Sequence, residues 1–216
     1  MTPAPSPMTS QLIQAVEQAS SALGLLQATQ ALAAVEDPAA ASCLVEVLGF
    51  NNPGAAVAAV DGLIRLGPQA VEPILDCLDP RNYGARAWAV RALAGIGDVR
   101  GLEVLEEALA TDVGPSVRRA AACGLGQLRL EALMEQEREA VRLRCLEALE
   151  AGCRDGEWVV RYGVVFGLEA LALLVEPMGD PHQRARRALA SLSQAPAEET
   201  PVVRLRAALA LRRLEA

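Results

Sequence analysis

One stretch of sequence decides the fold: Val57-Ala-Ala-Val-Asp-Gly-Leu-Ile-Arg-Leu66, which returns 30 residues later as Ala87-Trp-Ala-Val-Arg-Ala-Leu-Ala-Gly-Ile96. Apolar residues in both copies recur at the three- and four-residue spacing of an amphipathic helix. The pair formed by Leu93 and Ile96 then recurs farther along the chain, as Leu125 and Leu128, as Leu168 and Leu171, and as Leu211 and Leu214. The same helix is therefore repeated along most of the sequence.

An arginine occupies one aligned position in four of these helices, as Arg86, Arg118, Arg161 and Arg204. Repeats of about 30 to 45 residues with an internal helical pattern are typical of solenoids built from helix pairs, of the HEAT or armadillo type. We therefore predict an all-α, right-handed α-solenoid of about five to six HEAT-like helix pairs. Proteins of this class work by presenting an extended surface to a partner or a ligand.

Short turns separate the predicted helices, and each turn places Asp or Asn beside Pro or Gly. Examples are Asn51-Asn-Pro-Gly54, Asp79-Pro-Arg-Asn82 and Asp112-Val-Gly-Pro115. Residues of these types end one helix and cap the next. The last predicted helix pair covers 182–195 and 201–215. We expect a single solenoid domain over residues 10–216, preceded by a disordered tail over residues 1–9, which is rich in proline.

The composition narrows the classes of function. Apolar residues make up 52% of the chain but aromatic residues only 3%, so the core must consist of Ala, Leu and Val. The formal net charge is −7, whereas a repeat protein that grips nucleic acid through its phosphates is strongly basic; we therefore expect no nucleic-acid partner. No apolar run is long enough to span a membrane and the N-terminus has no signal-peptide pattern, so we expect a cytoplasmic protein.

The chain contains five cysteines and one histidine, and these counts limit which disulfides and metal sites are possible. The cysteine count is odd, no CxxC motif occurs, and most of the cysteines fall in predicted helices, which favours free thiols in a reducing cytosol. A single histidine gives no zinc-ligand pattern, so we expect no metal site. That histidine, His182, opens the last helix pair, where we expect it to be exposed to solvent.

The recurring arginine lies on the core side of its helix. On a helical wheel, Arg86 falls within about 60° of Leu93, together with other apolar residues. A buried charge needs a partner. An aspartate precedes three of the arginines by six or seven residues: Asp79 before Arg86, Asp112 before Arg118, and Asp155 before Arg161. We predict that these residues form Asp–Arg pairs between repeats, with a structural rather than a catalytic role.

The opposite side of the repeated helices carries the candidate binding residues. Second helices line the concave side of such solenoids, and this side is rich in Gly and Ala, which let a ligand approach the backbone. The candidate ligand-binding residues are Asp61, Trp88, Arg91, Arg119, Cys123, Tyr162 and Phe166. Two interpretations stay open at this point: a face that binds a partner or ligand, or a face that tight curvature buries against neighbouring helices.

Catalytic side chains do not form a recognisable constellation. The sequence contains no Ser-His-Asp set, no phosphate-binding loop and no HExxH motif. Cys123 fits a small hydrophobic residue better than a transient thiol. An enzyme built on this chain therefore works by positioning a reactive ligand beside its target.

Three segments resemble one group of HEAT-repeat proteins. They are Asn82-Tyr-Gly-Ala-Arg-Ala-Trp-Ala-Val-Arg-Ala-Leu-Ala-Gly-Ile-Gly-Asp98, Gly114-Pro-Ser-Val-Arg-Arg-Ala-Ala-Ala-Cys-Gly-Leu-Gly126 and Glu157-Trp-Val-Val-Arg-Tyr-Gly-Val-Val-Phe-Gly-Leu168. These segments are similar to the smaller, F-type or beta subunit of the heterodimeric phycobilin lyases of cyanobacteria. The resemblance extends over about residues 50–190, and its first segment is the most specific.

The resemblance implies a bilin lyase or chaperone subunit that acts with an E-type partner. An E/F pair binds a linear tetrapyrrole, the phycobilin substrate, and attaches it through a thioether to a cysteine of a phycobiliprotein α subunit. No prosthetic group is implied. Lyases of this group that also isomerise the bilin carry an adjacent His-Cys pair, which this chain lacks. We therefore expect no isomerase activity.

Physical reasoning about the concave face assigns roles toward such a ligand. The two propionates of a bilin suit Arg91 and Arg119, its pyrrole N–H groups suit Asp61, and its flat π-system suits Trp88 and Tyr162. A structural Asp61–Arg91 pair without a ligand is the alternative for that position. The alternative function is a non-catalytic HEAT adaptor in phycobilisome assembly or degradation.

Overall fold

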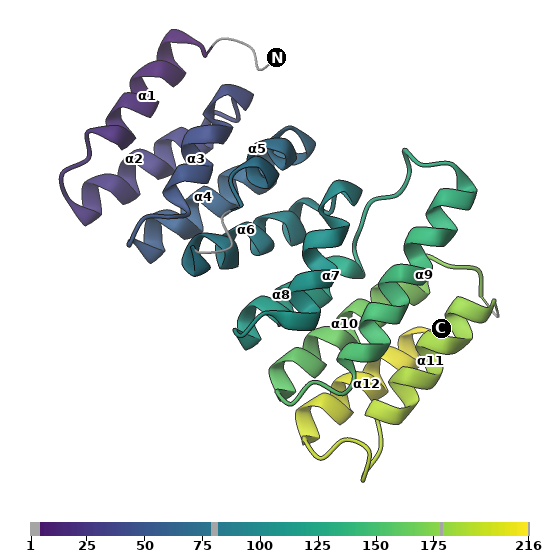
Figure 1. Cartoon of the computed structure of the whole chain (residues 1–216). Coiled ribbons are helices and arrows are strands. Elements are labelled where there is room, and N and C mark those ends of the chain that lie inside the picture. Colours follow the sequence, from purple (N-terminus) through teal and green to yellow (C-terminus); the bar gives the residue numbers. More distant parts are fainter. Residues whose placement is uncertain (1–4, 79–81, 178, 216) are drawn as a thin grey trace. The chain divides into compact units, whose positions relative to one another are not determined.

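The structure, a computed structural model, describes residues 5–78, 82–177 and 179–215. Within these ranges it consists of twelve α-helices and three short 3₁₀ turns, which confirms the predicted all-α, HEAT-like fold. The helices form two compact units, Met1–Gly101 and Leu102–Ala216, and each is considered by itself (Figure 1). A single right-handed solenoid over residues 10–216 stays a prediction.

Unit 1 stacks helix pairs, and its described residues form α1 (Pro7–Glu17), α2 (Ala22–Ala34), α3 (Ala41–Val47), α4 (Pro53–Leu66), α5 (Val71–Asp76) and α6 (Tyr83–Ile96). Helix α4 packs between α2 and α6. Each of these three second helices begins at a polar cap, because the side chains of Ser21, Asn52 and Asn82 accept hydrogen bonds from backbone N–H groups of the first turn. These are residue types that favour helix starts.

Unit 2 is built in the same way from α7 (Leu102–Thr111), α8 (Pro115–Leu125), α9 (Glu135–Gly152), α10 (Trp158–Leu173), α11 (Asp180–Leu192) and α12 (Pro201–Arg213). The second helices form one layer, with α10 between α8 and α12, and the first helices form another, with α9 between α7 and α11. Prolines at the starts of α8, α11 and α12 fit the first turn of a helix, where the missing N–H costs nothing.

Small residues allow α8 and α10 to approach closely. A Cβ atom on Gly126 would lie 2.3 Å from the carbonyl oxygen of Gly167, and one on Gly167 would lie 2.4 Å from that of Ala122. No side chain fits at either glycine, so the two backbones are in direct contact. Leucines such as Leu125, Leu149 and Leu168 fill the remaining space and are fully buried. This packing explains how a chain with few aromatic residues forms a core.

Helix α1 begins earlier than the predicted end of the tail. We expected disorder over residues 1–9, but the helix starts at Pro7. The Ser6 hydroxyl accepts a hydrogen bond from the backbone N–H of Thr9 at 3.1 Å, and the Thr9 hydroxyl donates to the Asp37 carboxylate at 2.5 Å. These bonds fasten the start of α1 to the turn that follows α2. The first four residues lie outside the described residues.

A ladder of arginine–carboxylate pairs joins successive repeats of unit 2. Arg118 donates through Nε and Nη2 to Asp155, at 2.7 and 3.0 Å, and Arg161 donates in the same way to Glu198, at 2.5 and 2.8 Å. Both arginine side chains are 16% exposed, and the Glu198 side chain is fully buried. The hydrogen bonds from Arg161 lower the pKa of Glu198 to about 2. Bidentate pairs of this kind are strong because two charge-assisted hydrogen bonds act together.

Each arginine of the ladder pairs with the carboxylate of the following repeat, and not with the aspartate that precedes it in sequence. The predicted Asp112–Arg118 and Asp155–Arg161 carboxylate pairs are wrong, because Nη1 of each arginine donates instead to the backbone carbonyl of that aspartate, at 2.8 and 2.7 Å. The aspartate side chains lie in the turn and accept hydrogen bonds from the backbone N–H groups two residues on. Asp79, the predicted partner of Arg86, lies outside the described residues.

Replacing Arg118 with alanine is expected to lower the free energy of unfolding by about 2–4 kcal/mol, because it leaves the mostly buried Asp155 carboxylate without its cation. The measurement is the denaturant midpoint at an unchanged slope. The control is Arg154→Ala, which removes an exposed arginine from the same region and should change stability by less than about 0.5 kcal/mol. An equally small change for Arg118→Ala would contradict the prediction.

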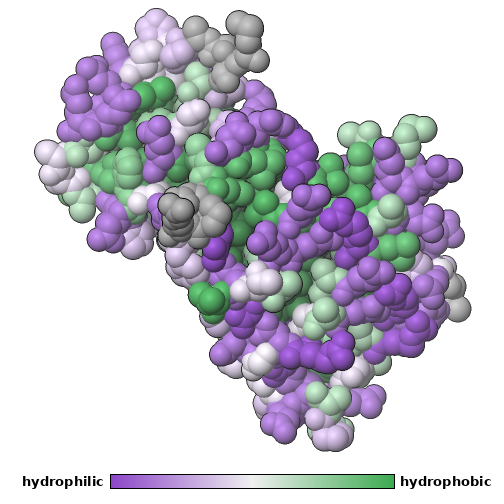
Figure 2. Space-filling view, viewed as in Figure 1, coloured by the Kyte–Doolittle hydropathy of each residue, from purple (hydrophilic) through white to green (hydrophobic). Residues whose placement is uncertain are grey.

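The outer layer of unit 2 is strongly charged. The mixed-sign stretch 135–144 lies in α9, where Arg138 and Arg142 both pair with Glu135, and Arg144 pairs with Glu106 of α7. Figure 2 shows hydrophilic side chains gathered over the region of α9 and α11. None of the helices in the described part of the chain is long and apolar enough to cross a membrane.

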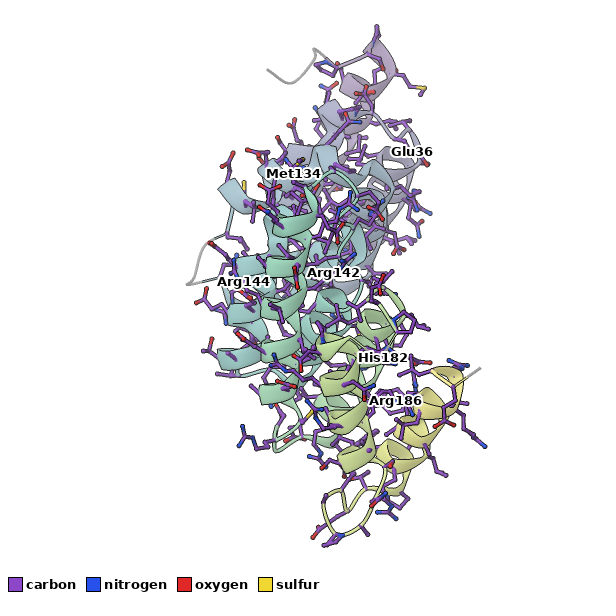
Figure 3. The ribbon with its side chains drawn as sticks, turned by 90° about the vertical axis from the view of Figure 1, so that its right-hand side faces the viewer. Glu36, Met134, Arg142, Arg144, His182 and Arg186 are labelled. Carbon is purple, nitrogen blue, oxygen red and sulfur yellow. The ribbon has the colours of Figure 1, made fainter. Side chains whose placement is uncertain are left out.

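His182 corrects another prediction. It lies at the start of α11, as Figure 3 shows, but it is buried rather than exposed, with 6% of its surface accessible. Its Nδ1 atom lies 3.2 Å from the carbonyl oxygen of Ala172 in α10. The sequence indicates a helix start at this position, but it does not reveal that the last turns of α10 cover the ring.

Candidate functional site

The candidate residues lie on the partly exposed side of the second helices, which we call the second-helix face. Asp61, Trp88 and Arg91 lie on α4 and α6 of unit 1, whereas Arg119, Cys123, Tyr162 and Phe166 lie on α8 and α10 of unit 2. The two sets are therefore described separately.

In unit 1, Trp88 and Arg91 interact directly. The central guanidinium carbon of Arg91 lies 4.7 Å from the centroid of the Trp88 ring, within the range of a cation–π contact. Trp88 is half-buried and lines a cleft of about 260 Å³, whose other walls come from residues 48–53, Gly84 and Ala85. The three-residue spacing of Trp88 and Arg91 thus places an indole and a guanidinium side by side, as the sequence predicts.

Asp61 is exposed on the neighbouring helix α4. Although both residues are described, the structure shows no ion pair between Asp61 and Arg91, so the alternative of a structural pair does not hold here. Stacking on an aromatic ring leaves the N–H groups of a guanidinium free to bind a carboxylate in its plane. Asp61 and Arg91 thus both keep their polar groups available to a ligand.

In unit 2, Cys123 and Phe166 are half-buried, and Arg119 is exposed. The Cys123 thiol donates a weak hydrogen bond to the carbonyl oxygen of Gly163 in α10, at 3.9 Å. Burial raises the pKa of this thiol, and the nearby charges of Arg119 and Arg206 only partly oppose that effect. A protonated, hydrogen-bonded thiol is a poor nucleophile. Cys123 is therefore part of the wall of this face.

The glycines of the face do not serve the purpose that the sequence suggested. A Cβ atom on Gly163 would lie 3.0 Å from the backbone oxygen of Arg119, and one on Gly95 would lie 2.4 Å from the Ile64 side chain. Both glycines allow neighbouring helices to pack. The expectation that they let a ligand reach the backbone is wrong at these two positions. In contrast, Gly84 lines the cleft, and a Cβ atom there would meet only the Asn82 side chain, at 3.8 Å.

One ionic cluster of unit 2 was not predicted from the sequence. This cluster is formed by Glu169 of α10 with Arg206 and Arg213 of α12. Glu169 is 5% exposed, and both arginines donate to its carboxylate. Arg206 also lies over the Phe166 ring, with its guanidinium carbon 5.8 Å from the ring centroid. One signal was available: an acidic residue on the apolar helix 158–173 needs a cationic partner when it is buried.

Comparison with known proteins identifies the family of the chain. A family model described as HEAT repeats matches residues 51–126. Over 167 residues the chain is 55% identical to the phycocyanin alpha phycocyanobilin lyase CpcF of Synechocystis sp. PCC 6803, and the match covers 77% of this chain and 78% of the relative. The chain belongs to the F-type, or beta-subunit, family of phycobilin lyases. The resemblance found in the sequence is thereby confirmed.

Other relatives match over different shares of the chain. The chain is 49% identical to the phycobilisome maturation protein of Synechococcus elongatus, over 97% of this chain and 99% of the relative. Identity falls to 34% for the bilin biosynthesis protein PecF of Mastigocladus laminosus, over 74% of this chain and 79% of the relative. The family is thus shared, but the chain resembles phycocyanobilin lyase subunits more than it resembles PecF.

Solved structures support both the family and the fold. One chain of the complex of CpcE and CpcF of phycocyanin lyase from Nostoc sp. PCC7120 matches with a TM-score of 0.70 and 41% identity, over 81% of this chain and 99% of that chain. A designed armadillo repeat protein matches with a TM-score of 0.57 at 19% identity, over 94% of this chain and 98% of that one. The second match concerns the fold alone.

Proposed function

We propose that this chain binds phycocyanobilin and, together with an E-type subunit, attaches it through a thioether to a cysteine of the phycocyanin α subunit. The observation that carries the proposal is the 55% identity to the Synechocystis phycocyanin alpha phycocyanobilin lyase over most of both chains. The solved complex of CpcE and CpcF supports the need for a partner subunit.

Attachment requires no nucleophile from this chain. The acceptor cysteine sulfur bonds to an unsaturated carbon of the bilin, and the thiol proton passes to the bilin, so the addition is neither an oxidation nor a reduction. The lyase contributes by holding the bilin in one orientation beside the acceptor thiol. A HEAT-type face without a catalytic constellation is suited to that task.

The residues of the second-helix face fit the groups of a linear tetrapyrrole. Trp88 offers a flat surface to a pyrrole ring, and Arg91 offers a planar donor fork to a propionate. Arg119 is a candidate for the second propionate, and Asp61 for the pyrrole N–H groups. In unit 2, Tyr162 and Phe166 are the candidate aromatic contacts. These roles are part of the proposal.

The purified chain alone is expected to attach little or no bilin, because the proposed active species is the heterodimer. The test combines this chain, phycocyanobilin and the phycocyanin α subunit, with and without an E-type subunit, and measures the visible absorbance that stays with the denatured acceptor. Strong attachment by the single chain would contradict the need for a partner, and the absence of attachment in the full mixture would refute the function.

A second candidate is a non-catalytic adaptor in phycobilisome maturation. The relative from Synechococcus elongatus that is described as a phycobilisome maturation protein favours this alternative. The same experiment separates the two candidates. An adaptor leaves attachment at the level of the spontaneous reaction, whereas a lyase subunit raises both its rate and its yield.

A further inference from the structure

Arg206 carries a hydrogen-bonding group that the fold does not use. Its side chain is only 10% exposed, and its Nη2 atom donates to the Glu169 carboxylate. Its Nη1 atom is buried as well but has no hydrogen-bond partner among the described residues. A buried donor without an acceptor costs free energy, and a charged donor costs more than a neutral one. Such a group in a folded protein needs an explanation.

The charges around Arg206 do not balance. The single carboxylate of Glu169 accepts hydrogen bonds from both Arg206 and Arg213. Arg119 of α8 acts on the same region, because its charge and that of Arg206 both influence the Cys123 thiol. Two guanidinium groups therefore share the Glu169 carboxylate. An incoming anion would be attracted to this part of unit 2.

A flat apolar surface lies next to the unused donor. The Arg206 guanidinium carbon is 5.8 Å from the centroid of the Phe166 ring, and Phe166 is half-buried on α10. A carboxylate that is attached to a planar ring system could therefore meet the guanidinium with its oxygens and the phenyl ring with its apolar part. A free inorganic anion would use only the first of these contacts.

We propose that Arg206 binds a propionate of the linear tetrapyrrole, with Phe166 against the adjoining pyrrole ring. The inference rests on the proposed function and adds Arg206 to Arg119 as a residue for the propionate that is assigned to unit 2. Glu169 acts as a positioning residue, because it holds the guanidinium through Nη2.

The experiment uses the complete heterodimer and two probes, phycocyanobilin and its dimethyl ester, in which both propionates are neutral. Binding is followed by the change in visible absorbance. Arg206→Gln is expected to weaken binding of the free acid about tenfold or more, as the loss of a charge-assisted hydrogen bond implies. The same variant should change the binding of the ester less than about twofold.

The matched control is Arg212→Gln, which removes an exposed arginine from the same helix without touching Glu169. This variant should bind both probes like the wild type. If Arg206→Gln folds poorly, Arg206→Lys serves instead, because an ammonium keeps the charge and the pairing with Glu169 but lacks the planar donor fork. Arg206→Lys should also weaken binding of the free acid more than binding of the ester.

Each other outcome overturns the inference in a recognisable way. Equal losses for acid and ester show that Arg206 only supports packing. If Arg206→Gln binds both probes as tightly as the wild type, the propionates bind elsewhere. If the wild type binds the acid and the ester equally well, no carboxylate is recognised. In these three cases the proposed function stands. If the wild-type heterodimer binds neither probe, the proposed function and this inference fail together.

Discussion

Replacing Arg161 with alanine is expected to lower the free energy of unfolding by about 3–5 kcal/mol, the range for breaking a buried ion pair. The Glu198 side chain is fully buried, and Arg161 supplies both of the guanidinium hydrogen bonds that its carboxylate accepts. Removing the arginine leaves a charged group in the core, with only Thr200 as a hydrogen-bond donor. The measurement is chemical denaturation at neutral pH.

The effect should also depend on pH with a defined sign. The pKa of Glu198 is lowered to about 2 in the folded protein by its hydrogen bonds with Arg161. A carboxyl group with a lowered pKa stabilises the fold fully above its ordinary pKa of about 4.3, and that stabilisation is lost as the pH falls toward the folded value. The difference in stability between the wild type and Arg161→Ala should therefore narrow as the pH falls from about 5 to about 2.

Arg204 offers a matched control at the same repeat position. Its Nη1 atom donates to the backbone carbonyls of Glu198 and Glu199, at 2.9 and 2.8 Å, and no ion pair is found for it within the described residues. Arg204→Ala should therefore cost only about 1 kcal/mol. If both variants lose the same stability, the carboxylate pairing is not what holds the ladder together.

The double substitution Trp88→Ala and Arg91→Ala is expected to abolish bilin attachment while the fold persists. The two side chains form one cation–π pair, in which Trp88 lines the unit 1 cleft, so their removal takes away both a flat surface and a planar donor fork. Attachment, measured as visible absorbance on the acceptor subunit, should fall about tenfold or more. The melting temperature should fall by no more than about 4 °C.

Trp158→Ala provides the control, because Trp158 is the other tryptophan of the chain and is 46% exposed at the start of α10. Its loss should leave attachment intact. If the double variant keeps its activity, the binding site does not include the Trp88–Arg91 pair. If its melting temperature collapses instead, this side of α6 belongs to the core and the binding interpretation fails.

The capping residues and the spacing of apolar residues in the sequence were sufficient to predict the helices. The turn at 51–54 caps α4 through Asn52, and the predicted last pair, 182–195 and 201–215, corresponds to α11 and α12 within a few residues. Both features follow from interactions among residues that are close in sequence, namely caps and apolar periodicity. Such local interactions can be predicted from the sequence without knowing which other helices pack against the helix.

Partners across repeats could not be predicted in the same way. The sequence correctly marks Arg118 as a residue that needs a carboxylate, but Asp112 and Asp155 are both plausible by charge. The choice depends on how far α9 and α10 are displaced from α7 and α8, which is a property of packing. His182 was misjudged for the same reason, since the segment that buries it lies on another helix.

The candidate site shows the same division. Spacing along one helix places Trp88 beside Arg91, and the structure has that contact. In contrast, the sequence does not identify Arg206 as a candidate binding residue. Its candidate role depends on contacts with Phe166 and Glu169, which lie on a different helix. A site that is assembled from several repeats becomes visible only when the repeats are stacked.

The register of the ladder in unit 2 has a consequence for how such arrays grow. The internal repeat of unit 2, α9 and α10, carries a carboxylate, Asp155, that receives the arginine of the repeat before it. It also carries an arginine, Arg161, that reaches the carboxylate of the repeat after it. A duplicated copy of that segment would bring one acceptor and one donor with it. Within the ladder, gain or loss of that repeat would therefore leave no arginine without a carboxylate, whereas loss of the last pair would remove Glu198 and leave Arg161 unpaired.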